Sequence, residues 1–280
     1  MNKNVSLLAI SYVFGFTAAT ITVFLSGIIG SQIASIKSLA TLPTALTVVG
    51  TAVFAALAAN IMSKIGRKLG FILASLASSI TCLLAAYAIY DRNFILFCVA
   101  NLILGACMAF THQYRFAAAE SVEKDKAPKA ISIIMLSGIV AAFLGISSAN
   151  YTKDIFTDFQ YVGSYITLAI FMFMPTIFFL FYENKNTSKT EFSKNHTNRS
   201  YFEIISQPRF LQAVIAAAFA YAIMSFLMTA TPMSMHLMEK MSLEKTGLVL
   251  QIHVAAMFLP SLITGHLIKK LGHSNIIYIG

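Results

Sequence analysis

The sequence predicts an all-α protein embedded in a membrane, and three observations lead to this fold class. Only 11% of the 280 residues are charged, whereas a soluble domain carries about 25% charged residues. The charge-free stretches are long enough to cross about 30 Å of bilayer hydrocarbon as helices. In addition, a short basic turn occurs twice, at comparable places in two parts of the chain.

Eight charge-free stretches predict eight complete transmembrane helices, because each exceeds the roughly 20 residues that a helical crossing needs. In chain order they are residues 4–36, 38–63, 69–90, 93–114, 130–152, 159–182, 210–238 and 246–268. A buried helix of a soluble protein is seldom apolar on every face over such a length. A ninth apolar run starts at residues 275–280. We expect about four more helices to follow, so that the chain is a C-terminally truncated part of a twelve-helix protein.

The distribution of basic residues predicts the orientation. With a cytoplasmic N-terminus, fifteen of the 20 lysine and arginine residues lie on the cytoplasmic side. The five on the other side are Lys37, Arg92, Lys153, Lys240 and Lys245. Because positive charge gathers on the cytoplasmic side, we expect a multi-pass protein of the bacterial inner membrane with its N-terminus inside. This topology explains the net charge of +9 without a nucleic-acid partner, and the lipid bilayer is the expected surrounding.

Composition divides the chain into three parts. Residues 1–182 hold six predicted helices and form an N-terminal bundle. Residues 183–209 are polar and predict a cytoplasmic linker, and residues 210–280 start a C-terminal bundle with helices 7, 8 and the beginning of 9. The three cysteines fall inside predicted helices, which argues against a disulfide framework, and no metal-ligand spacing occurs. We expect no metal, no cofactor and no enzymatic activity.

The repeated basic turn follows the second and the eighth predicted helix, at residues 59–68 and 265–274. Its defining positions are Ala59, Ser63, Lys64, Gly66, Arg67 and Lys68 in the first copy, and Gly265, Lys269, Lys270 and Gly272 in the second. Glycine permits a sharp turn, and the bases anchor the turn at an anionic leaflet. The repeat predicts two related bundles, as in transporters built from internal repeats. The alternative is that these bases only set the topology.

The first copy resembles the signature loop of the major facilitator superfamily, Gly-x-x-x-Asp-Arg-x-Gly-Arg-Arg/Lys. Gly66, Arg67 and Lys68 match the last part of this motif, whereas Ser63 stands at the aspartate and Ala59 at the first glycine. The resemblance implies major-facilitator-type helical bundles. In that family the aspartate belongs to a latch that opens and closes during transport, so its absence implies that the latch is weakened or relocated here.

Predicted helices 4 and 5 carry further partial matches. Many proton-coupled relatives have Arg-x-x-x-Gly-x-Gly-x-Ala in helix 4, and here Asn101 stands at the arginine and Gly105 at the first glycine. Gly138 and Gly145 resemble the glycine-rich helix 5 of antiporters, although Ile146 replaces its proline, which speaks against antiport. The resemblance assigns these three glycines to close helix packing.

Uncharged polar and aromatic side chains predict a solute site between the bundles. The candidates for solute contact are Tyr12, Thr17, Asn101, Tyr221, Ser225, Gln251 and His253. Such a lining suits a neutral, partly apolar solute. Pro232, near the outer end of helix 7, marks either a break that serves as an outer gate or a simple helix end.

Ion coupling has few candidates, since no aspartate or glutamate falls inside a predicted helix. They are His112, Arg115 and His253. Three roles stay open for Arg115, namely binding an anionic group, pairing with Glu120, or extending to the membrane surface. His253 either contacts the solute, carries a proton or packs in the core. Protons are therefore one option for the coupling ion.

Taken as a whole, the sequence predicts a monomeric secondary transporter that moves a small organic solute across the inner membrane by alternating access. Segments 113–120 and 228–233 are similar to a drug- or metabolite-transporter-like bacterial branch of the superfamily, which brings no substrate with it. The alternative is a membrane sensor or scaffold that keeps the fold without transporting.

Overall fold

The computed structural model describes residues 2–184, 203 and 205–279, and the regular elements within these residues are helices. The α-helices are α1 (Lys3–Ile33), α2 (Leu42–Ile65), α3 (Arg67–Tyr90), α4 (Phe94–Thr111), α5 (Tyr114–Glu120), α6 (Ala127–Thr152), α7 (Val162–Leu180), α9 (Pro208–Met233), α10 (Leu243–Phe258) and α11 (Ser261–Ile279). Short turns of other helix types are η1 (Lys37–Leu39), η2 (Lys124–Lys126) and η3 (Ser234–Met238). The predicted linker falls largely outside the described residues.

Eight helical segments of the described chain are long and apolar enough to cross a membrane. They coincide with the eight charge-free stretches, so the predicted number of complete spans is confirmed. The boundaries differ by a few residues. For example, α1 ends at Ile33, before the predicted end at residue 36, because Ala34 is already extended and its N–H closes the last turn on the carbonyl of Gly30.

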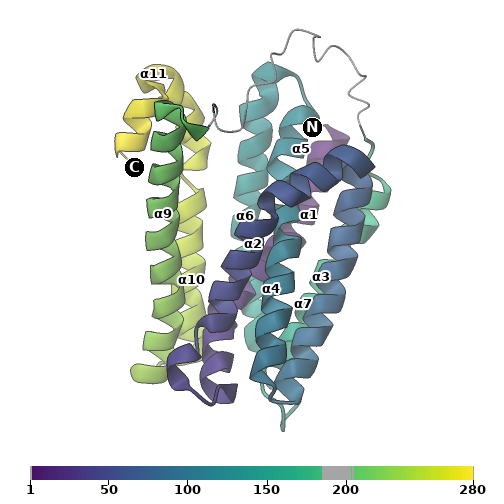
Figure 1. Cartoon of the computed structure of the whole chain (residues 1–280), viewed down its shortest axis with the longest axis vertical. Coiled ribbons are helices and arrows are strands. Elements are labelled where there is room, and N and C mark those ends of the chain that lie inside the picture. Colours follow the sequence, from purple (N-terminus) through teal and green to yellow (C-terminus); the bar gives the residue numbers. More distant parts are fainter. Residues whose placement is uncertain (1, 185–202, 204, 280) are drawn as a thin grey trace.

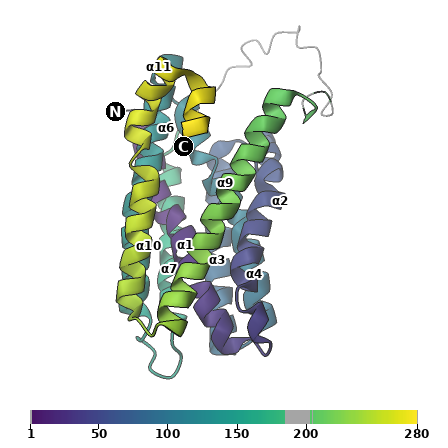
Figure 2. The ribbon, with the colours of Figure 1, turned by 90° about the vertical axis from the view of Figure 1, so that its left-hand side faces the viewer.

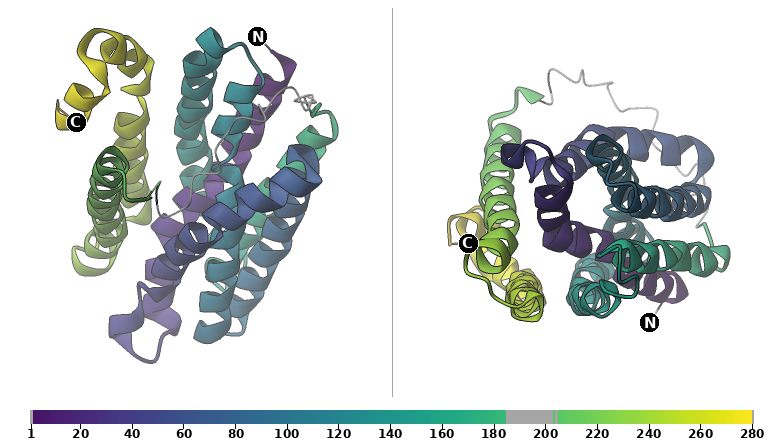
Figure 3. Two further views of the ribbon diagram at one scale, coloured as in Figure 1. Left: turned by 45° about the horizontal axis from the view of Figure 1, so that its top comes forward. Right: turned by 90° about the horizontal axis from the view of Figure 1, so that it is seen from below.

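The helices form two groups that lie side by side (Figure 1). Helices α1–α7 make up one group, and α9–α11 line one side of it, as the view from below shows (Figure 3). The two groups touch mainly where α10 packs on α6 and where α9 packs on α1. We call the end at which α7 stops and α9 starts the linker end. Helices α9 and α10 are close together at the opposite end and diverge toward the linker end (Figure 2).

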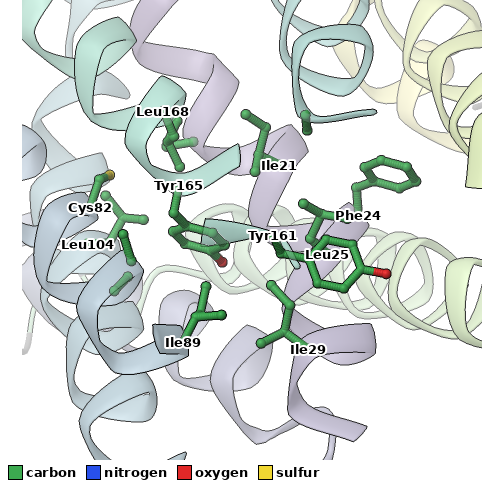
Figure 4. Packing of buried hydrophobic residues seen from close by; sticks show 14 of the residues in the cluster. Ile21, Phe24, Leu25, Ile29, Cys82, Ile89, Leu104, Tyr161, Tyr165 and Leu168 are labelled. Carbon is green, nitrogen blue, oxygen red and sulfur yellow. The ribbon is translucent and has the colours of Figure 1, made fainter. Parts of the chain in front are cut away.

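One apolar cluster joins the two groups near the end opposite the linker. It includes Phe24 of α1, Ile146 of α6, Met228 of α9 and Leu250 of α10. Figure 4 shows Phe24 and Tyr165 within this cluster. Because lipid chains are as apolar as these side chains, the contact derives from close packing and not from escape from water.

Helices α2 and α4 touch backbone to backbone. A Cβ atom added to Gly50 would lie 2.2 Å from the carbonyl oxygen of Leu102, and one added to Gly105 would lie 2.1 Å from that of Thr47. Small residues allow membrane helices to approach this closely. Gly105, which the sequence assigns to helix packing, therefore lies directly on α2.

The residues that follow α7 tie three helix ends together at the linker end. Asn4 Nδ2 donates to the carbonyl of Glu183 at 2.8 Å, and the Glu183 N–H donates to Asn4 Oδ1 at 3.2 Å. Lys3 Nζ donates to the Glu183 carboxylate at 2.6 Å, and this hydrogen bond lowers the pKa of Glu183. Asn184 Oδ1 accepts from the N–H of Lys68 at 3.0 Å. These contacts join α7 to the beginnings of α1 and α3.

Two helix ends can be compared with the sequence prediction. The predicted fourth helix, expected to continue to residue 114, is interrupted at His112 and Gln113, so that Arg115 lies in the separate short helix α5. The sequence left open whether Pro232 breaks this helix or marks its end. In the structure α9 continues through Pro232, ends at Met233 and passes into the π-helical turn η3. Proline removes one backbone donor from a helix, and here it stands two residues before the π-helical turn.

We predict that Gly105→Val destabilises the protein by about 1–3 kcal/mol or more, because the added atoms overlap the backbone of α2. Thermal unfolding of the purified protein in detergent measures this loss. The matched control is Ala56→Val on the exposed face of α2, which should unfold at the temperature of the unmodified protein. Equal midpoints for both variants would contradict the contact.

Candidate functional site

The two basic turns share one unusual backbone conformation. Gly66 has φ 84° and ψ 157°, and Gly272 has φ 79° and ψ 161°. This region is populated almost solely by glycine. The sequence repeat is thus also a repeat in backbone geometry, and Gly272 separates two helices within α11.

An ion pair connects the first basic turn to the short helix α5. Arg67 Nε donates to Glu120 Oε2 at 2.7 Å, and Arg67 Nη2 donates to Glu120 Oε1 at 2.5 Å. The sequence did not reveal this carboxylate partner. Among the described residues Glu120 pairs with Arg67, and no ion pair between Glu120 and Arg115 is present. Lys68 Nζ donates to the carbonyl of Leu180 at 2.6 Å, which adds α7 to the assembly.

The other motif positions of the turns have simple surroundings. Ser63 Oγ donates to the carbonyl of Asn60 in its own helix at 2.7 Å, while Ala59 and Lys64 are exposed. In the second copy Lys270 is exposed, and a Cβ atom at Gly272 would meet no atom within 4 Å. Gly265 and Lys269 lie outside the residues whose surroundings the structure describes.

Asn101 lies at the centre of a buried polar network within the first group of helices. Its Oδ1 accepts from Thr47 Oγ1 at 3.2 Å and from Ser26 Oγ at 3.3 Å, and its Nδ2 donates to the carbonyl of Phe97 at 2.8 Å. The hydroxyl of Tyr165 lies 2.9 Å from Ser26 Oγ. Side chains of α1, α2, α4 and α7 meet here, so Asn101 is placed inside the bundle and away from α9 and α10.

Gln251 bridges the two groups of helices. Its Nε2 donates to Ser147 Oγ at 3.0 Å and to the carbonyl of Phe143 at 3.4 Å, both on α6. One turn away, a Cβ atom at Gly247 of α10 would lie 2.7 Å from Ile146 of α6. The contact of α6 with α10 is therefore both close and hydrogen-bonded.

The two packing glycines of α6 face different helices. A Cβ atom at Gly138 would lie 2.8 Å from the ring of Phe258 on α10, and one at Gly145 would lie 2.6 Å from Thr20 on α1. Both positions therefore permit close approach, as the resemblance implies. Thr17 also lies against Gly145 and is fully buried.

Tyr221 and His253 line one cleft between α9 and α10. This cleft has a volume of about 650 Å³, and its other lining residues include Met224 and Met257. The walls are apolar or aromatic, and the imidazole and the phenol supply hydrogen-bonding groups. Ser225 lies one turn along α9 next to Tyr221. The structure thus brings together three of the predicted solute contacts.

Tyr12 and Arg115 lie near the interruption between α4 and α5. Tyr12 is buried, stacks on Phe16 with ring centroids 5.1 Å apart, and contacts Tyr114 edge to face. The guanidinium of Arg115 lies 5.0 Å from the ring centre of Phe116. Its Nε is buried and has no hydrogen-bond partner within the described chain. His112 caps the end of α4, three positions before Arg115.

A comparison with known families decides the classification of this arrangement. The profile of the Major Facilitator Superfamily matches residues 6–280. The chain belongs to this superfamily. Membership fits the eight apolar spans, the two related basic turns and the two groups of helices, and it makes the protein a multi-pass membrane transporter by family.

Relatives within the superfamily include the riboflavin transporter RfnT of Brucella anthropi, which is 32% identical over 280 residues. The alignment covers 99% of this chain and 70% of RfnT. The uncharacterized MFS-type transporters YddS and YdeG of Bacillus subtilis are 25% and 26% identical, and the chain spans 65% and 66% of their lengths. No solved structure matches. Among the described residues no group of His, Cys, Asp or Glu is arranged to hold a metal ion.

In this superfamily member the seven predicted solute contacts fall into distinct environments. Tyr221 and His253 line the cleft, Ser225 lies next to Tyr221, and Gln251 lies at the joint of α6 with α10. Tyr12, Thr17 and Asn101 are buried inside the first group, and a solute role for them stays a prediction.

We predict that the Arg67–Glu120 pair holds the first basic turn against α5. Arg67→Gln and Glu120→Gln should each cost about 1 kcal/mol or less in stability, since both side chains are partly exposed. The exchange Arg67→Glu with Glu120→Arg should recover part of this loss. Thermal unfolding measures it, with Lys126→Gln at an exposed pair as the control. A double exchange that is no better than the sum of the single changes would argue against the pairing.

Proposed function

We propose that this protein is a secondary transporter of the bacterial inner membrane that moves riboflavin or a closely related flavin by alternating access. One observation carries the solute class, namely the 32% identity to a riboflavin transporter over 99% of the chain. The other relatives are uncharacterized and add the family alone.

The chemistry of the cleft supports a flavin. Riboflavin is uncharged at neutral pH and combines a flat aromatic ring system with a polar hydroxylated tail. The acidic residues of the described helices lie at helix ends, as Glu120 and Glu244 do, so these helices place no carboxylate in the membrane interior that would select a cation. Tyr221 and Met224 provide surfaces on which a flat ring packs, and His253 provides a hydrogen-bonding edge.

The contacts between the two groups of helices support alternating access. At the end opposite the linker, a Cβ atom at Gly27 of α1 would lie 3.0 Å from Met233 Sδ of α9. Because most basic residues gather at the linker end, we infer that this end is cytoplasmic. The contact of α1 with α9 then closes the periplasmic side, and rocking of one bundle against the other opens it. His253, His112 and Arg115 are the candidates for coupling to protons.

We predict that vesicles containing the purified protein take up riboflavin, detected by flavin fluorescence after removal of external flavin. Tyr221→Phe and His253→Ala should raise the concentration for half-maximal uptake by about tenfold each, because each loses one hydrogen bond to a polar solute. Uptake is measured with and without an imposed proton gradient.

Tyr87→Phe is the matched control, because Tyr87 is exposed on α3 away from the cleft. Its uptake should equal that of the unmodified protein. Uptake of other neutral heterocycles without uptake of flavin would support the transporter role and contradict the proposed solute class. If no solute of a broad panel crosses, a sensor or scaffold role is favoured.

A further inference from the structure

A second cavity lies on the outer surface of the first group of helices, away from the α9–α10 cleft. It is a groove of about 490 Å³ between α2, α3 and α4. Phe54 and Ile65 of α2, Leu73 and Ala77 of α3, and Ile103 and Phe110 of α4 are among its lining residues. All of these side chains are apolar. A polar solute would lose hydrogen bonds to water here without replacement.

The groove exists because α2 and α3 separate after a close contact at the basic turn. A Cβ atom at Gly70 would lie 2.5 Å from Met62 Cγ, so the two helices are in contact there. From this point α2 runs obliquely across α4 while α3 runs alongside it (Figure 1). Alanines fill little of the resulting space, since Ala74 and Ala77 of α3 and Ala106 of α4 form part of the wall.

The groove lies within one leaflet of the bilayer. Along α2 it extends from Phe54, at the middle of the helix, to Ile65 at the linker end. Eleven helical steps of about 1.5 Å give a length of about 16 Å along α2. Because α2 is oblique, the groove covers less than this in depth and fits within half of the roughly 30 Å hydrocarbon thickness. The lining side chains Leu73 and Ile103 are exposed in the described structure.

The rim of the groove at the linker end is positively charged. Lys64 precedes the lining residue Ile65, is exposed, and has no ion pair among the described residues. Arg67, one turn before Gly70 on the groove side of α3, is already neutralised by Glu120. Lys68 also has no ion pair within the described chain, but its Nζ donates to the carbonyl of Leu180 on α7. Lys64 is therefore the lysine next to the groove lining that can contact a lipid headgroup.

We propose that this groove is a binding site for one acyl chain of an anionic phospholipid, with Lys64 contacting the phosphate of the headgroup. The apolar walls match the chain, the groove fits within one leaflet, and the charge of Lys64 matches the phosphate. The site is separate from the proposed solute cleft, and it holds whatever solute the protein transports.

Tryptophan fluorescence provides a direct test, because the chain contains no tryptophan. Phe110→Trp places a single reporter in the groove, with Ile103→Trp as a second choice if the first variant folds poorly. Phe226→Trp, on the exposed face of α9, is the control reporter.

Each tryptophan variant is reconstituted into phosphatidylcholine containing increasing fractions of brominated phosphatidylglycerol or brominated phosphatidylcholine. The groove reporter should reach half quenching at about fivefold lower fractions of the anionic lipid, as expected for one lysine at the surface. The control reporter should not distinguish the lipids.

Two further changes separate the headgroup from the chain. Lys64→Gln should abolish the preference for phosphatidylglycerol while leaving quenching by phosphatidylcholine in place. Ala77→Leu should reduce quenching by both lipids because it fills the groove, whereas Ala56→Leu on the exposed face of α2 should change nothing. Equal quenching by both lipids at the groove reporter, or an unchanged preference in Lys64→Gln, would overturn the proposal. Weak quenching by either lipid at both groove positions would show that no acyl chain enters, and would overturn it as well.

Discussion

Close approach of helix backbones at small residues is the constraint on which this structure depends. In a bilayer the hydrophobic effect does not drive helices together, so dispersion contacts and interhelical hydrogen bonds must do so. Gly50 and Gly105 bring α2 onto α4, Gly145 brings α6 onto α1, and Gly138 receives Phe258 of α10. Small residues also permit the close contact between the two groups of helices. Where small residues have no close neighbour, they leave open space.

Polar groups in the spans are handled in two ways. Most serine and threonine hydroxyls donate to a carbonyl of their own helix, as Thr22 and Ser75 do, which satisfies them at no cost in packing. Asn101 instead collects partners from other helices. In an apolar surrounding such a network is specific, because its members are satisfied only when four helices keep their positions. Tyr221 and His253, in contrast, line the α9–α10 cleft.

The helical spans were predictable from the sequence because length and absence of charge are local properties. The repeated turn at Gly66 and Gly272 was also predictable, since a repeated glycine between basic residues predicts a repeated turn. The Arg67–Glu120 pair was not, because nothing in the spacing of two residues 53 positions apart indicates that they meet. Asn101 illustrates a second limit. Composition does not give the rotation of a helix about its axis, so the sequence could not show that Asn101 is fully buried and bonded to side chains of neighbouring helices. The interruption at His112 has no proline or glycine to mark it.

The ties around Glu183 have a consequence for the very beginning of the chain. Asn4 and Glu183 are 179 positions apart, yet the side-chain amide of Asn4 forms hydrogen bonds with both the carbonyl and the N–H of Glu183. The first turn of α1 is therefore part of the support of the sixth span. An affinity tag or reporter protein fused directly before Asn2 would strain the contacts of Lys3 and Asn4 with Glu183. An extended spacer between the fused protein and Asn2 would preserve them.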